Sequence, residues 1–163
     1  MKTLWLIASL LASAAVAAPA THCDSAERVV FSCTISGSKK VASLCEDPGR
    51  FDEGTSLQYR FGTLGRADMV YPKLKRGSLE KFFAHFESHP ELSMREIWFR
   101  IGSYEYLVAS EGRSRDKAHN HIVVYKDSRP VANHQCAHTL VNDLDHLGGR
   151  IPDANDTGYF RRK

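Results

Sequence analysis

Two alternating runs joined by Gly102-Ser103 constrain the fold of this chain more than any other feature of its sequence. From Arg95 to Ser110, apolar side chains recur at every second position on both sides of these two residues. Glycine in the first position of a two-residue loop is typical of a type II′ turn. That turn places Ile101 opposite Tyr104 and brings the apolar positions of both runs onto one face. The sequence therefore predicts a β-hairpin with an apolar face.

The second face of this hairpin carries one charged pair and one apolar pair. The same register places Arg100 opposite Glu105, and opposite charges on neighbouring strands stabilise a sheet. It also places Trp98 opposite Leu107. We therefore expect the second face to be covered as well.

Most of the remaining chain also has the character of strands. Residues 57–61 alternate Leu, Tyr and Phe with Gln and Arg, which predicts a half-buried strand. A second hairpin is expected over His119–Cys136, with its loop at Asp127–Pro130. Runs rich in β-branched and aromatic residues predict further strands at Arg28–Ser36, Lys40–Cys45 and Ala67–Tyr71.

Helical patterns are few and short. Ser78–Glu87 fits an apolar helix stripe capped by Ser78, and it also fits the alternation of a strand. Thr139–Leu147 places its leucines on one helical face and is followed by Gly148-Gly149, which predicts a short helix. The predicted fold class is mainly β: a single-domain antiparallel sandwich or barrel-like sheet with one or two short helices.

The first residues predict export. Lys2 precedes an apolar run from Leu4 to Val16, and Ala15-Val16-Ala17 offers an A-x-A cleavage site. This pattern is typical of a secretory signal peptide over residues 1–17, and no other stretch is apolar enough for a membrane span. We expect a soluble periplasmic protein with one β domain over residues 18–152 and a polar tail over residues 153–163.

The net charge and the cysteines further limit the functional class to which the protein can belong. The 163 residues include 22 Lys+Arg and 19 Asp+Glu, a net charge of +3 that does not favour nucleic-acid binding. All four cysteines follow the predicted signal peptide, and an even number in an exported chain predicts two disulfides. Their pairing is left open among three connectivities. The cysteines are Cys23, Cys33, Cys45 and Cys136.

The sequence predicts no catalytic residue and no cofactor, because it has no G-x-S-x-G elbow and no CxxC pair. One alternative is based on histidines. If the second hairpin turns at Asp127–Pro130, His121 lies opposite Cys136 and near His134, with His138 four residues further on. These three imidazoles could converge on a metal, which would make the chain a secreted metal-binding protein or a hydrolase.

One connection is suited to contacting a partner. The segment Ser110–Lys117 follows the best-specified strand and alternates cations with small residues. A cationic, hydroxyl-bearing loop on a stiff hairpin can enter an acidic cleft, and the alternative is a solvated connection without a role. The predicted contact residues are Ser110, Arg113, Ser114 and Arg115.

Several segments carry a family resemblance. The first two strands contain Val30-Phe31-Ser32-Cys33 and Ser43-Leu44-Cys45, and later strands contain Tyr59-Arg60-Phe61-Gly62 and Tyr104-Glu105-Tyr106. This layout resembles that of small exported proteobacterial β proteins and, more distantly, periplasmic lysozyme inhibitors and immunity proteins. The resemblance implies a disulfide-bearing inhibitor whose partner is a peptidoglycan-degrading enzyme or an antibacterial toxin.

Overall fold

A computed structural model describes residues 19–49, 54–113 and 118–155 of the chain. The predicted signal peptide therefore lies outside the described residues. Within them the fold is mainly β, with two single-turn 3₁₀ helices, and this confirms the predicted class. The elements are β1 (Arg28–Ile35), β2 (Lys40–Asp47), β3 (Ser56–Thr63), β4 (Arg66–Tyr71), η2 (Leu79–Lys81), β5 (Phe82–His89), β6 (Leu92–Ile101), β7 (Tyr104–Arg113), β8 (His119–Lys126), β9 (Arg129–Asn142) and η3 (Leu144–Leu147).

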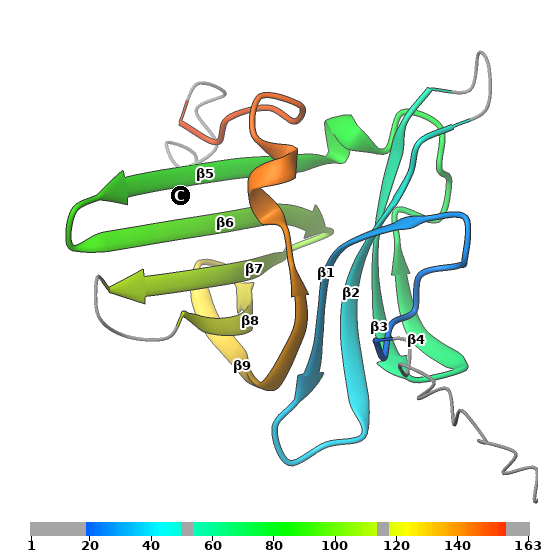
Figure 1. The fold of residues 1–163 in the computed structure, drawn as a ribbon, viewed down its shortest axis with the longest axis horizontal. Helices are drawn as coiled ribbons and strands as arrows, with labels where there is room; N and C mark the ends of the chain where they lie inside the picture. Colours follow the sequence, from blue (N-terminus) through cyan, green and yellow to red (C-terminus); the bar gives the residue numbers. More distant parts are fainter. Residues whose placement is uncertain (1–18, 50–53, 114–117, 156–163) are drawn as a thin grey trace, which may run out of the picture.

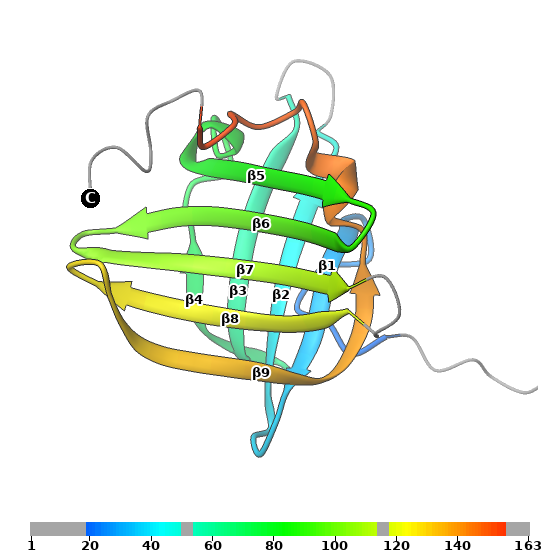
Figure 2. The ribbon, with the colours of Figure 1, turned by 90° about the vertical axis from the view of Figure 1, so that its left-hand side faces the viewer.

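All nine strands belong to one antiparallel sheet in the order β4-β3-β2-β1-β9-β8-β7-β6-β5. Two meanders, β1–β4 and β5–β9, are joined where β9 pairs with β1. The sheet curls so that the two meanders face each other with their strands crossing steeply (Figures 1 and 2). No helix among these residues is long and apolar enough to cross a membrane.

The core lies between the two facing meanders. Tyr59 of β3 and Phe99 of β6 come from opposite halves, and their ring centroids are 5.0 Å apart. Phe99 also stacks on Tyr71 and on Tyr106, with 4.9 Å between centroids in each pair. Phe99 has no exposed surface. This aromatic cluster fixes the distance between the two layers, because rings pack at preferred separations and orientations.

The predicted hairpin over residues 95–110 is confirmed. Ile101 pairs with Tyr104, and Gly102 has a φ of 60°, as the first position of this turn requires. Trp98 and Leu107 are 5% and 3% exposed on the second face. The expected cover over this face is also found, since Trp98 and Leu107 pack in one cluster with the fully buried Ala154.

The second hairpin has a two-residue turn, and its second strand begins at Arg129, two residues earlier than predicted. Asp127 and Ser128 have φ values of 49° and 63°, which is the signature of a type I′ turn, and Lys126 pairs with Arg129. The expectation of a four-residue loop over Asp127–Pro130 is therefore wrong. A bulge follows, and His121 then lies opposite Gln135 instead of Cys136.

The predicted helix over Thr139–Leu147 is wrong in its first half. Residues 139–142 extend β9 because their backbones pair with β1, and only Leu144–Leu147 forms a 3₁₀ turn. The open alternative at Ser78–Glu87 is resolved as the short turn η2 followed by the strand β5. The predicted polar tail is held to the sheet near its start, because the N–H of Ala154 donates to the carbonyl of Ala84 in β5.

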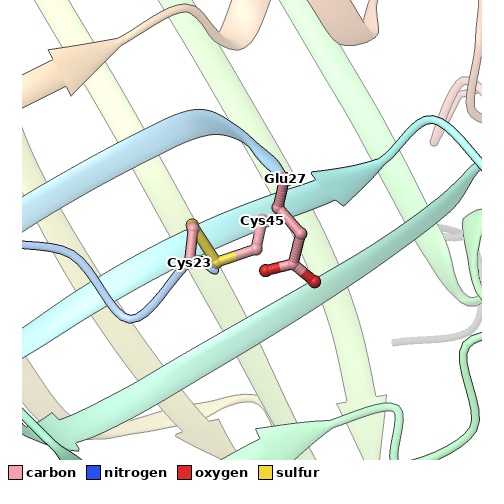
Figure 3. Close-up of side chains that lie close together, drawn as sticks. All are labelled: Cys23, Glu27 and Cys45. Atoms are coloured by element: carbon pink, nitrogen blue, oxygen red, sulfur yellow. A yellow bond between two sulfur atoms is a disulfide. The ribbon is translucent and has the colours of Figure 1, made fainter. Parts of the chain in front are cut away.

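Two disulfides are present, as predicted, and they join Cys23 to Cys45 and Cys33 to Cys136. The first ties the segment before β1 to the outer face of the β1–β4 meander, with the Glu27 carboxylate beside it (Figure 3). Arg60 of β3 donates to both carboxylate oxygens of Glu27 at 2.7 Å. The prediction of a half-buried strand over residues 57–61 is therefore wrong on its polar side, because Gln58 and Arg60 are only 5% and 8% exposed.

Glu27 makes the stability of the fold sensitive to acid. Burial raises the pKa of the Glu27 carboxyl, but hydrogen bonds from Arg60 and Lys75 outweigh it, and the pKa lies below its ordinary 4.5. The ion pair therefore stabilises the fold fully above pH 4.5, and this contribution is lost as the pH falls through the lowered pKa. We expect Glu27→Gln to cost about 3 kcal/mol at pH 7 and to flatten the acid dependence in urea unfolding.

The exposed Glu80→Gln is the matched control and should change the free energy of unfolding by less than about 0.5 kcal/mol. If Glu27→Gln lost stability below pH 4.5 as steeply as the unmodified protein, this assignment of the acid sensitivity would be wrong.

The two disulfides should contribute unequally to stability. Cys33–Cys136 closes a sequence separation of 103 residues and Cys23–Cys45 one of 22. Loop-closure entropy then assigns about 5 and about 3 kcal/mol to them. We expect Cys33→Ala with Cys136→Ala to lower the urea midpoint more than Cys23→Ala with Cys45→Ala. The reverse order would show that the first disulfide acts mainly through the packing it secures.

Candidate partner-binding site

The first four residues of the predicted contact loop, Ser110–Arg113, belong to strand β7 instead. Strand β7 continues to Arg113, and Ser110 inside it is only 5% exposed, with its Oγ accepting a hydrogen bond from Asn142 at 2.8 Å. The prediction that Ser110 belongs to an exposed loop is therefore wrong, because β6 and β8 pair with β7 on both sides at this position. Ser114 and Arg115 lie outside the described residues.

Arg113 is exposed and stands at the last position of β7. Its backbone pairs with Leu92 of β6. On the other side of β7, Glu111 pairs with His119 of β8. A strand held on both sides almost to its end keeps the Arg113 backbone in one place. The side chain is therefore presented from a stiff support.

A groove of about 450 Å³ lies at the ends of these strands. It forms where the β5–β6 turn approaches the end of β7 and the start of β8. The side chains are mixed in character, with an imidazole and a guanidinium among apolar groups. The lining residues are His89, Pro90, Leu92, Ser93, Gly112, Arg113 and Ala118.

A second groove of about 360 Å³ shares Ala118 with the first. It opens where β9 leaves β8: their pairing ends at His121 and Gln135, and Cys136 is the first residue of β9 to pair with β1. Figure 2 shows β9 turning away from the beginning of β8 at this corner. The lining residues are Ala118, His119, Asn120, Gln135, Cys136, Ala137, His138 and Thr139.

Arg113 differs from most of the described arginines in lacking an ion pair, a feature that it shares with Arg76 and Arg129. Ion pairs hold Arg28, Arg60, Arg66, Arg95, Arg100 and Arg150 against carboxylates of this chain. Arg113 forms no ion pair with any residue that the structure describes. No described carboxylate therefore competes for the donors of this guanidinium, which can bind a carboxylate of another molecule in a two-pronged geometry.

The three histidines of the metal hypothesis do not converge. His134 pairs with the core residue Ile122 and lies beside the Phe61 ring at 5.5 Å, so it faces the core. His121 pairs with Ala109 on the opposite face, with its Nε2 3.8 Å from a Glu111 oxygen. His138 is exposed, and its backbone pairs with Thr34. The one-residue error in the predicted register explains the difference, since a slip of one residue reverses the faces.

Among residues 19–49, 54–113 and 118–155, three potential metal ligands lie close together only at Cys23, Glu27 and Cys45. Both sulfurs there are joined in a disulfide (Figure 3). The carboxylate accepts hydrogen bonds from Arg60 and Lys75. This group therefore holds the chain segment before β1 in place and offers no free ligand set.

Sequence reasoning missed His89, Pro90 and His119 as parts of the grooves. The signal for them is the strand-like alternation of Phe82, Ala84 and Phe86, in a segment that the sequence left open between helix and strand. A strand over these residues would have placed the turn after His89 at the open end of the β6–β7 hairpin.

No protein-family model, curated protein or solved structure matches the chain. The geometry of the two grooves is therefore the basis for assigning a function.

Proposed function

We propose that this chain is a periplasmic inhibitor or immunity protein that blocks a cell-wall hydrolase, either a lysozyme or an antibacterial toxin. The observation that carries the proposal is Arg113, a cation without an ion pair among the described residues, which lines the first groove at the end of a strand paired on both sides up to Glu111. The two disulfides support an oxidising compartment such as the periplasm.

The chemistry of the partner favours this arrangement. Glycoside hydrolases that cleave the cell wall work with a pair of Asp or Glu side chains in the cleft that holds the sugar. An arginine can donate two parallel hydrogen bonds to one such carboxylate, which both places and neutralises it. Entry of Arg113 into the cleft would therefore block the reacting carboxylates directly.

A stiff support makes this mode of inhibition efficient. Ordering of loops and side chains on association opposes binding, and a contact that is already ordered avoids that cost. Pro90 and Leu92 add apolar contact area beside Arg113, while His89 and His119 supply polar atoms at the rim. Apolar contact surrounded by a polar rim is the usual composition of a protein interface.

Inhibition assays on purified lysozymes and peptidoglycan-degrading toxins test the proposal. We expect the unmodified protein to slow at least one of them in a cell-wall turbidity assay. Arg113→Ala should then weaken binding by about 2–5 kcal/mol in calorimetry, because it leaves a buried carboxylate unpaired. Arg113→Lys should restore only part of the affinity, since lysine lacks the two-pronged geometry.

Arg129→Ala is the matched control. Arg129 is also exposed and forms no ion pair with the described residues. It begins β9 at the turn of the β8–β9 hairpin, which is the end of the hairpin away from the grooves. Its removal should change binding by less than about 0.5 kcal/mol. Equal affinity of the Arg113→Ala and unmodified proteins, or no inhibition of any hydrolase, would reject the proposal.

A further inference from the structure

Residues 72–77, in the connection between β4 and η2, expose a leucine to solvent. Leu74 is 81% exposed, the highest value among the large hydrophobic side chains that the structure describes. Its neighbours Lys73, Lys75, Arg76 and Gly77 are exposed as well. We call this segment the Leu74 loop.

Buried polar groups fix the backbone of the Leu74 loop. The side chain of Gln58 donates to the carbonyl of Pro72 at 2.7 Å, and the N–H of Ser78 donates to the carbonyl of Lys75 at 3.0 Å. Ser78 is itself held, because its Oγ accepts a hydrogen bond from Leu57 N–H at 2.7 Å. Gln58 and Ser78 are 5% and 1% exposed. The leucine therefore projects from an ordered loop.

The surroundings of Leu74 are cationic. From residue 73 to residue 81 the sequence has three lysines and one arginine against a single glutamate. Lys75 is committed to Glu27 and Asp47 at 2.9 and 2.8 Å. Lys73 and Arg76 form no ion pair with the described residues. Two cations that have no ion pair among the described residues therefore flank one exposed apolar side chain.

We propose that the Leu74 loop docks this protein on anionic phospholipid bilayers. Leu74 enters the boundary between headgroups and acyl chains, and Lys73 and Arg76 contact lipid phosphates. A single apolar tip between cations is typical of interfacial membrane contact. A protein interface has an apolar core and buries about 800 Å² on each partner. The exposed neighbours of Leu74 supply no such core.

The position of the loop keeps this contact separate from the grooves. The Leu74 loop leads through η2 into the first residue of β5, whereas His89, at the last residue of β5, lines the first groove. Eight extended residues span roughly 26 Å. The loop and the grooves thus lie near opposite ends of β5, and Figure 2 shows η2 and the β7 arrowhead on opposite sides. This inference does not rest on the proposed inhibition.

Vesicle sedimentation with the mature full chain tests the inference. We expect binding to vesicles of phosphatidylglycerol and phosphatidylcholine at low salt, with loss of binding on pure phosphatidylcholine or at high salt. Leu74→Ser should lower the partition coefficient about tenfold or more. Reversal of both free cations in Lys73→Glu with Arg76→Glu should also lower it more than tenfold, since each basic residue adds roughly fivefold.

Two matched variants control for hydrophobicity and net charge. Leu64→Ser removes a leucine that is 48% exposed in the β3–β4 turn, and Lys39→Glu with Arg129→Glu makes the same charge change elsewhere. Both controls should keep the partition coefficient within about threefold of the unmodified value. The inference is overturned by equal binding to both kinds of vesicle, by Leu74→Ser binding like the unmodified protein, or by binding to acidic proteins alone.

Discussion

The double pairing of β9 is the constraint on which the rest of the structure depends. This strand of 14 residues pairs first with β8 and then, from Cys136 onward, with β1. Because β8 and β1 belong to different meanders, one strand joins both into a single sheet and turns their apolar faces toward each other. The Cys33–Cys136 disulfide fixes the point of transfer. The groove beside Ala118 follows from the same geometry, since β8 loses its neighbour where β9 departs.

Both outward faces of the curled sheet are also occupied, and this determines where another molecule can bind. The segment around Cys23 covers Gln58 and Arg60 on one side, and Ala154 packs on Trp98 and Leu107 on the other. Contacts with other molecules are therefore left mainly to strand ends and loops. Arg113 and Leu74 are both of this kind, and both project from backbones that buried groups hold in place. The two positions point to different chemistry: a carboxylate for the first and an anionic lipid surface for the second.

Local patterns in the sequence predict much of the fold, because alternation and turn residues act over short distances. The hairpin at Gly102-Ser103 is correct in register as well as in extent. The predicted register of the β8–β9 hairpin is wrong by one residue. With Pro130 close by, the sequence gives no clear signal for the type I′ turn at Asp127-Ser128 or for the bulge after it. That error brought His121 and His134 onto one face. Gln58 was misplaced for another reason: its cover comes from a segment distant in sequence, and alternation cannot report such long-range packing.

The central claim is that a hydrolase is bound at the end of β7. Photo-crosslinking in cells that produce the protein measures this most directly, with a photoreactive amino acid in place of Pro90 in one variant and Arg129 in another. Pro90 lies beside Arg113 in the first groove, so this substitution keeps the guanidinium in place. Both substituted positions are exposed, so non-specific capture should be equal. Binding through Arg113 predicts a covalent adduct with a peptidoglycan-degrading enzyme or toxin from position 90 alone. Adducts of the same composition from both positions, or none with a hydrolase, would contradict it.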